Sequence, residues 1–358
     1  MARALALAVR GLGLTSPNPA VGAVLVRDGR VVGEGAHMRA GGPHAEAAAL
    51  AAAGEAACGA TCYVTLEPCA HQGRTPPCAD ALVAAGVARV VAACQDPNPL
   101  VDGQGLGRLR AAGVEVVTGI AETEARALNR AFFAFVRTGR PHVTLKSAMT
   151  LDGKIAAWDG TSRWITGEAA REEAHRMRFA ADAILVGIGT VLRDDPELTV
   201  RLSDAPPKEP FRVVADSRLR TPLGARLLRA GDPSRTIVAC PAPAPARRAA
   251  ALRARGVRVL ELPRQDRRAD LHALLGALAK LDVVALLAEG GAELGAALLD
   301  AGLVDRIAFF VAPRLLGGRT APGPVGGVGR ALKEALSVTG LTYRTIGEDL
   351  LVEGDVAH

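Results

Sequence analysis

Aromatic residues are scarce in this chain: phenylalanine, tryptophan and tyrosine make up 3% of its 358 residues. Proteins that bind single-stranded nucleic acid without sequence preference stack bases on aromatic side chains, so this scarcity argues against that class. The 43 lysines and arginines, which help to give a net charge of +6, are scattered and form no basic tail. We therefore expect a phosphate-bearing small molecule, and no nucleic acid, as the partner.

Long apolar runs are also missing, since none reaches the ~18 residues that a membrane-spanning helix needs. The first residues are apolar, but Arg10 interrupts them early and no convincing small-residue cleavage site follows. An amphipathic helix ending near Gly11 or Gly13 is therefore a better interpretation than a signal peptide. We expect a cytoplasmic protein without membrane contact, whose six cysteines are reduced.

The length predicts two domains, and the hydrophobic pattern makes both of them α/β. In the first half, residues 20–36 indicate two strands around an Asp28-Gly29 turn. The segment 44–55 is typical of a helix and 62–68 of a buried strand. Two further segments, 78–94 and 105–119, each indicate a helix, a glycine turn and a strand.

The segment Gly139-Arg140-Pro141 is the expected boundary, which gives domains 1–140 and 141–358. The second domain begins with a strand near 142. Further apolar runs typical of strands lie at 182–189, 211–217, 235–240, 257–262, 283–291 and 306–313. Helical patterns lie among them at 167–181, 245–255, 268–280 and 292–301.

Three residues of the first domain have the side chains of a zinc site. His44 stands at the start of a predicted helix, Cys69 follows a predicted strand, and Cys78 opens the next helix. Three protein ligands leave one coordination position for water, which is the catalytic pattern of zinc. Glu46, two residues after His44, is then placed to transfer protons.

Each of these residues alone has a simpler explanation. A single histidine is usually a surface or core residue, and two buried cysteines behave as small hydrophobic side chains. A disulfide between Cys69 and Cys78 would need an oxidising compartment. Together, however, H-x-E, then P-C, then C match the signature of zinc deaminases, although the usual C-x-x-C is here a gap of eight residues.

The gap carries a more specific resemblance. The sequence PCAHQGRTPPC (68–78) resembles the PC-x-H-x-G-R-T-P-P-C element of bifunctional riboflavin-biosynthesis deaminase–reductases. SPNPAVGAV (16–24) and DPNPLVDGQG (96–105) are similar to two further elements of that family, in the same order. The resemblance implies a cytidine-deaminase-like three-layer fold in which His44, Cys69 and Cys78 hold Zn²⁺ and Glu46 relays protons.

The same resemblance implies substrate contacts near the metal. Asn18 would hold the substrate ring or ribose, although a turn former in a proline-rich loop is an equally good explanation. His71, Arg74 and Thr75, in the loop between the two cysteines, would hold a substrate 5′-phosphate. The alternative for these three is a solvated loop.

The second half lacks a G-x-G-x-x-G fingerprint. Its nearest substitute is AEGGAELGAALL (288–299), where an apolar strand leads through two glycines into a helix whose first N–H groups suit a pyrophosphate. KSAMTLDGKIA (146–156), TSRWITG (161–167) and VVADSRLRTP (213–222) resemble the reductase half of the same family, which is similar to dihydrofolate reductase in fold and uses NADPH.

The resemblance implies two sets of contacts in this half. Those to NADPH are Met149, Trp164, Thr190, Asp194, Ser217 and the turn Gly291, Ala292, Glu293, Leu294, Gly295, Ala296 and Ala297. Those to substrate are Ser162, Arg178, Leu198, Arg201 and Glu289. Trp164 could equally be a core residue, and either arginine a surface ion-pair partner. The roles of Asp152 and Lys154 stay open.

The sequence therefore predicts a bifunctional enzyme of riboflavin biosynthesis. Zinc lowers the pKa of bound water to near 7, which makes hydroxide available for deaminating a diaminopyrimidinone ribosylamine phosphate. The second domain would reduce the ribosyl group to ribityl with NADPH. Two alternatives remain: a nucleobase or nucleic-acid deaminase fused to an unrelated domain, and a binding module with a structural zinc. We also expect a homo-oligomer, with a homodimer as the working assumption.

Overall fold

The computed structural model describes residues 1–70, 76–99 and 101–358. The chain divides into two compact units, Met1–Arg140 and Pro141–His358, which are described separately below. Among the described residues, no helix is both long and apolar enough to cross a membrane.

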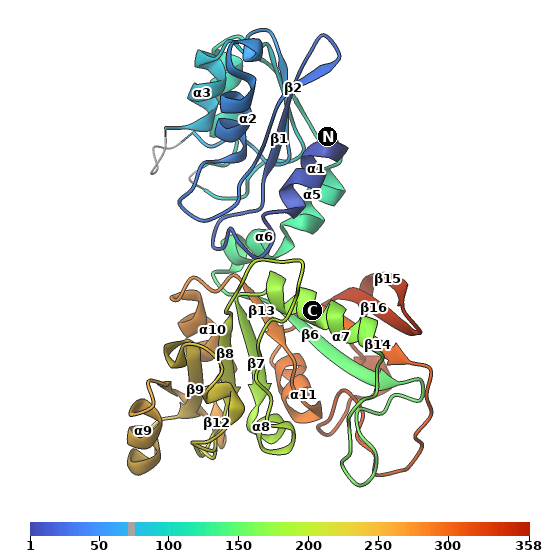
Figure 1. Cartoon of the computed structure of the whole chain (residues 1–358). Helices are drawn as coiled ribbons and strands as arrows, with labels where there is room; N and C mark the ends of the chain where they lie inside the picture. The colour runs from blue at the N-terminus through green and yellow to red at the C-terminus, as the bar shows by residue number, and fades with distance from the viewer. Residues whose placement is uncertain (71–75, 100) are drawn as a thin grey trace. The chain divides into compact units, whose positions relative to one another are not determined.

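The first unit is built on a five-stranded sheet with the order β2-β1-β3-β4-β5. Figure 1 labels β1 and β2 of this sheet. The strands are β1 Gly22–Arg27, β2 Arg30–Ala36, β3 Thr61–Val64, β4 Arg89–Ala92 and β5 Glu115–Thr118. β1 is antiparallel to β2 and β3, while β3, β4 and β5 are parallel. Asp28 and Gly29 both have positive φ angles, of 50° and 74°, which is the backbone that a tight hairpin turn requires.

Helices cover both faces of this sheet. Because side chains alternate along a strand, Ala23 and Leu25 of β1 pack in a core with one group of helices. That group is α2 Ala45–Ala53, α3 Cys78–Ala84 and α4 Gln104–Ala111. A second core joins α1 Ala2–Val9, α5 Glu122–Leu128 and α6 Arg130–Thr138 on the other face. The predicted three-layer arrangement is confirmed.

The second unit has a nine-stranded sheet with the order β10-β9-β8-β7-β13-β6-β14-β16-β15. In this order, the strands from β10 at one edge through to β14 are parallel to one another. β16 and β15 follow at the other edge, and each is antiparallel to the strand before it. The parallel strands are β6 His142–Thr150, β7 Ala183–Gly187, β8 Phe211–Ala215, β9 Thr236–Pro241, β10 Arg258–Leu262, β13 Ala285–Ala288 and β14 Arg306–Ala312. The two others are β15 Val338–Ile346 and β16 Asp349–Val356.

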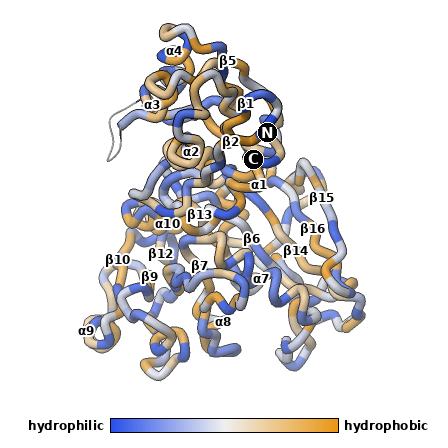
Figure 2. Tube along the Cα trace, turned by 45° about the horizontal axis from the view of Figure 1, so that its top comes forward, coloured by the Kyte–Doolittle hydropathy of each residue, from blue (hydrophilic) through white to orange (hydrophobic). Residues whose placement is uncertain are grey.

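The core of this unit also has two sides. Ala183 and Leu185 of β7 pack with α10 Leu271–Ala279 and α11 Ala292–Asp300, while Ile184 and Val186 pack with α8 Ile188–Asp194 and α9 Ala246–Arg253. α7 Glu168–Ala180 packs on β14 and β16 through a smaller cluster. Figure 2 shows the hydrophobic residues concentrated along these strands and the outer loops mostly hydrophilic.

Several predicted boundaries were wrong, among them those of the strands expected at 182–189 and 283–291, which are Ala183–Gly187 and Ala285–Ala288. The helix expected at 268–280 begins only at Leu271, because the Asp270 carboxylate accepts hydrogen bonds from the N–H groups of His272 and Ala273 and so caps the helix there. The preceding residues form a short hairpin of β11 Arg264–Gln265 and β12 Arg268–Ala269. The strand expected at 62–68 is shorter and ends at Val64.

Candidate active sites

One histidine and two cysteines meet at a single point of the first unit. His44 immediately precedes α2, Cys69 lies in the loop after β3, and Cys78 is the first residue of α3. The Nδ1 atom of His44 lies 3.3 Å from Sγ of Cys78 and 3.6 Å from Sγ of Cys69. All three donor atoms lie within 4.8 Å of one another. One imidazole nitrogen and two sulfurs at this spacing fit zinc with three protein ligands.

The backbone of α3 holds Cys69 in this position. The N–H of Cys78 donates to Sγ of Cys69 at 3.3 Å, and the N–H of Ala79 donates to the Cys69 carbonyl oxygen at 3.1 Å. Hydrogen bonds from the Cys78 and His44 side chains outweigh burial and lower the pKa of Cys69 to about 4. A lowered pKa favours the thiolate, which is the form of cysteine that binds a metal.

Glu46 lies in the first turn of α2, two residues after His44, and is only 4% exposed. Burial raises the pKa of Glu46 to about 7. Both its protonated and its ionised forms are then accessible near neutral pH, as a group that takes up and releases protons requires.

Asn18 lies beside a histidine that the sequence did not single out. Nδ1 of His37 lies 2.8 Å from the Pro43 carbonyl oxygen, which can only accept, so Nδ1 carries the proton. Nε2 of His37 then accepts from Nδ2 of Asn18 at 3.2 Å. Asn18 is thereby oriented to offer its Oδ1 acceptor to a ligand. The ring of His37 also packs edge-on against His44, with centroids 5.3 Å apart.

Three residues expected to hold a phosphate, His71, Arg74 and Thr75, lie outside the described residues. Their roles remain predictions from the sequence.

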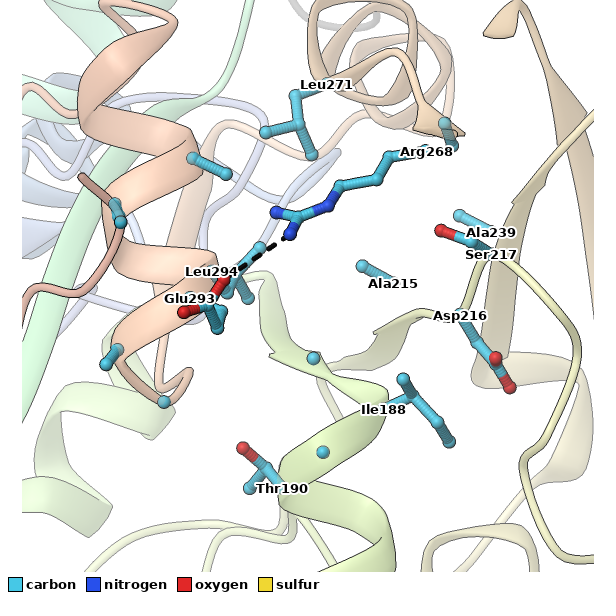
Figure 3. Close-up of a pocket in the computed structure, with 18 of the residues that line it drawn as sticks. Ile188, Thr190, Ala215, Asp216, Ser217, Ala239, Arg268, Leu271, Glu293 and Leu294 are labelled. Carbon is cyan, nitrogen blue, oxygen red and sulfur yellow. Dashed lines mark hydrogen bonds and ion pairs between the residues drawn. The ribbon is translucent and has the colours of Figure 1, made fainter. Parts of the chain in front are cut away.

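In the second unit, a cavity of about 1150 Å³ lies at the carboxyl ends of the parallel strands β7 and β8 and at the start of α11 (Figure 3). This edge is the usual ligand site of open α/β sheets. Most residues expected to contact a dinucleotide line it: Thr190, Asp194, Ser217, Gly291, Ala292, Glu293, Leu294, Ala296 and Ala297. Ser162, expected to contact substrate, lines it too.

The start of α11 has the geometry of an anion site. Gly291 immediately precedes the helix, and a Cβ atom on Gly290 would lie 2.7 Å from the Leu294 side chain. Gly295, the remaining member of the predicted turn, is buried against Leu145 and Pro324. Gly291, Ala292 and Glu293 all line the cavity, so the N-terminal end of α11 and its dipole face it.

Arginines gather around this cavity. Those lining it are Arg193, Arg218, Arg220, Arg267 and Arg268. The hairpin of β11 and β12 brings Arg268 over the cavity, where its Nη2 lies 3.4 Å from Oε2 of Glu293 (Figure 3). This hairpin lies partly where a helix was expected, so neither Arg267 nor Arg268 was predicted to contribute.

A largely buried cluster of charges lies at the carboxyl end of β13. Arg178 on α7 forms a two-point ion pair with Glu289, and Nζ of Lys146 on β6 lies 3.9 Å from the same carboxylate. Burial alone would raise the pKa of Glu289, but the charges of Arg178 and Lys146 lower it to about 2. Burial lowers the pKa of Lys146, against the opposing effect of Glu289. Lys146 was not predicted as a site residue, because it stands in a strand pattern.

The remaining predicted contact residues do not line the cavity. Met149 lies in β6 and Trp164 is 61% exposed with the Arg171 guanidinium 4.8 Å from its ring; neither lines the cavity. Leu198 is buried in a core cluster, so only its backbone could meet a substrate. Arg201 is paired with Glu197 at 3.0 Å on the surface.

Asp152 and Lys154 have a structural explanation. The Asp152 carboxylate accepts hydrogen bonds from the N–H groups of Leu316 and Gly317, and Nζ of Lys154 donates to the Ala321 carbonyl oxygen. These two residues therefore connect the turn after β6 to the loop after β14.

Comparison with known proteins adds the family. The model of the cytidine and deoxycytidylate deaminase zinc-binding region matches residues 1–94, and that of the RibD C-terminal domain matches residues 141–352. The chain is 45% identical to the riboflavin biosynthesis protein RibD of Actinobacillus pleuropneumoniae over 99% of this chain and 93% of that protein. It is 47% identical to RibD of Escherichia coli over 88% of each.

Two solved structures resemble the whole chain. One is Acinetobacter baumannii RibD, at a TM-score of 0.89 and 42% identity, covering 100% of this chain and 98% of that one. The other is a deaminase/reductase of Thermotoga maritima, at a TM-score of 0.85 and 36% identity, covering 100% and 97%. These matches confirm the predicted fold class and the resemblance inferred from the motifs. The chain belongs to the RibD family of riboflavin biosynthesis proteins, in which a deaminase domain is followed by a reductase domain.

Proposed function

We propose that the first domain deaminates 2,5-diamino-6-(5-phosphoribosylamino)pyrimidin-4-one with zinc. The second domain then reduces the ribosyl group of 5-amino-6-(5-phosphoribosylamino)uracil to ribityl with NADPH. The observation that carries the first half is the convergence of His44, Cys69 and Cys78 beside the buried Glu46. The cavity at the start of α11 carries the second half.

In the deaminase domain, His44, Cys69 and Cys78 are the residues that would hold zinc. Zinc bound there acts as a Lewis acid that makes water a nucleophile near neutral pH. Glu46 would take up a proton from the attacking water and deliver one to the departing amino nitrogen, and a pKa of about 7 suits both transfers. Asn18, oriented by His37, accepts a hydrogen bond from the substrate ring.

In the reductase domain, the N-terminus of α11 would bind the pyrophosphate of the cofactor, and Ser217 with the neighbouring arginines its 2′-phosphate. NADPH bound there supplies a hydride. The substrate also needs a proton on the atom next to the reduced carbon. Lys146 is our candidate donor, because its side chain is largely buried beside Glu289 and its pKa is lowered. Arg178 and Glu289 hold Lys146 and the substrate in place.

The comparisons give no support to a nucleic-acid deaminase fused to an unrelated domain, since the RibD relatives cover both halves of the chain. A purely structural zinc would normally have four protein ligands, whereas the described residues offer three at this point. A homodimer stays a prediction from the sequence.

The deciding experiment incubates the zinc-loaded protein with the diaminopyrimidinone substrate, with and without NADPH. We expect ammonia release in both cases and NADPH oxidation only when both substrate and cofactor are present. Ammonia release from oligonucleotides but not from this substrate would contradict the proposal. NADPH oxidation without ammonia release would contradict the deaminase half alone.

A further inference from the structure

The motif DPNPLVDGQG (96–105) has no role in the function proposed above. The two ends of this segment meet at one side chain, that of Glu67, which is only 4% exposed. The Glu67 carboxylate accepts hydrogen bonds from backbone N–H groups at both ends of this segment. These donors are Asp96 at 3.2 Å, Gly103 at 3.0 Å, Gly105 at 2.9 Å and Leu106 at 3.2 Å.

Such an arrangement is costly to build and strong once formed. A buried carboxylate is tolerated only when hydrogen bonds replace its hydration. Bonds from N–H groups to an ionised oxygen are stronger than those between neutral groups. Each oxygen of Glu67 accepts two of these hydrogen bonds, so the carboxylate holds the start of α4 and the backbone of Asp96 together.

A direct contact reinforces this connection. A Cβ atom on Gly105 would lie 1.8 Å from the Pro68 carbonyl oxygen and 3.3 Å from Oε1 of Glu67. Only glycine therefore lets α4 approach the chain at this point. Gly103, with a φ of 82°, supplies the left-handed turn that aims its N–H at Glu67.

The contact falls directly before a proposed zinc ligand. Pro68 is followed by Cys69. The sulfur of Cys69 accepts a hydrogen bond from the N–H of Cys78, and its carbonyl oxygen accepts one from the N–H of Ala79. Cys69 therefore stands between two anchors: α3 on one side, and Glu67 with Gly105 on the other. Zinc sites depend on such supporting contacts, whose loss typically lowers metal affinity or activity by about 10- to 100-fold.

We propose that Glu67 is a positioning residue of the deaminase centre, which holds Cys69 in place for the metal by fixing the start of α4 against Pro68. This inference rests on the zinc site of the proposed function. It assigns the 96–106 segment to the support of the metal centre. It also implies a coupling in both directions, because a contact that strengthens metal binding is itself strengthened when the metal binds.

Two substitutions test the contact from opposite sides. Glu67→Gln keeps the size of the side chain but places an NH₂ group against two N–H donors. Gly105→Ala adds one methyl group against the Pro68 carbonyl. Gly107→Ala is the matched control, because it lies in the same helix and a Cβ atom there meets nothing within 4 Å.

The measurements are zinc affinity by competition with a chromogenic chelator, the deaminase kcat and KM, and reductase activity in the same preparation. We expect Glu67→Gln and Gly105→Ala to weaken zinc binding about 10- to 100-fold. When saturated with zinc, both variants should show a lower deaminase kcat with a smaller change in KM. Their reductase activity should stay within about twofold of that of the parent chain. For Gly107→Ala, zinc affinity and both activities should stay within about twofold of the parent values. Unchanged zinc affinity and kcat in folded Glu67→Gln and Gly105→Ala variants would overturn the inference.

A measurement on the unaltered chain covers the case in which these variants fail to fold. Hydrogen exchange at the amides of Gly103, Gly105 and Leu106 should be slower with zinc bound than after chelation, whereas amides of β15 should not change. Equal exchange with and without zinc would contradict the coupling. If the unaltered chain bound no zinc at all, the proposed function would fail before the role of Glu67 came into question.

Discussion

Arg178 and Glu289 form a two-point ion pair inside the reductase domain, with Nε to Oε1 at 2.5 Å and Nη2 to Oε2 at 2.9 Å. The third nitrogen of Arg178 donates to the Thr199 carbonyl oxygen at 3.1 Å. The guanidinium is therefore already engaged before any ligand binds. Arg178 stabilises the ionised carboxylate of Glu289 beside Lys146. A contact between Arg178 and the substrate would be made in addition to this ion pair.

This pair predicts the effect of removing Arg178. Arg178→Ala leaves the buried Glu289 carboxylate without its main partner, which costs about 3–5 kcal/mol in comparable buried pairs. We expect reductase kcat/KM to fall by more than 100-fold, equivalent to about 3 kcal/mol, while ammonia release is retained. Arg176→Ala is the control on the same helix, since Arg176 pairs with Glu172 and Asp204 at the surface. Equal losses in both variants would show that the ion pair has no special role.

The low pKa of Glu289 predicts a pH dependence of stability. Its folded value of about 2 lies below the ordinary value of about 4.3, so folding favours the ionised form. The resulting stabilisation is fully present above about pH 4.3 and is lost as the pH falls toward 2; it amounts to at most ~3 kcal/mol.

Glu289→Gln should therefore flatten this part of the stability curve. Urea unfolding between pH 3 and 6 measures it, followed by tryptophan fluorescence because Trp158 and Trp164 both lie in the second unit. A parallel pH dependence in the parent chain and the variant would disprove the assignment to Glu289.

Glu46 predicts a separation of the two activities. Glu46→Gln removes the group that exchanges protons but none of the three proposed zinc ligands. General acid–base groups contribute about 10²- to 10⁴-fold, so we expect deaminase kcat to fall by that factor with zinc content and reductase activity unchanged. Glu55→Gln, an exposed carboxylate just after α2, serves as the control. Retained ammonia release in the Glu46 variant would rule out its proton-transfer role.

The arginines around the reductase cavity predict cofactor choice. Hydrogen bonds to charged groups contribute about 1.5–3 kcal/mol, so Arg218→Ala or Arg268→Ala should raise the KM for NADPH about 10- to 100-fold. The KM for NADH, which lacks the 2′-phosphate, should change little. Arg264→Ala is the control from the same hairpin, because Arg264 does not line the cavity. If the parent chain used NADH and NADPH equally well, the 2′-phosphate site would have to be abandoned.

The sequence predicted best what depends on neighbouring residues. The hairpin at Asp28-Gly29, the helix that starts after His44 and the helix that Cys78 opens are all local patterns, and all three are present. It missed what depends on partners far along the chain. Lys146 acquires its chemical character from Glu289, 143 residues later, and His37 from Asn18 and His44. Arg268 was missed because its short hairpin resembles the start of the helix that follows.

The contact between Gly105 and Pro68 has a consequence for protein engineering. At this point the two segments are separated by less than the space of one carbon atom, so each segment has to fit the other. A chimera that takes residues 68–78 from one deaminase and residues 96–106 from another should keep its metal centre only if glycine occupies position 105 and glutamate position 67. Grafting the loop between the cysteines to change the substrate therefore means grafting its support as well.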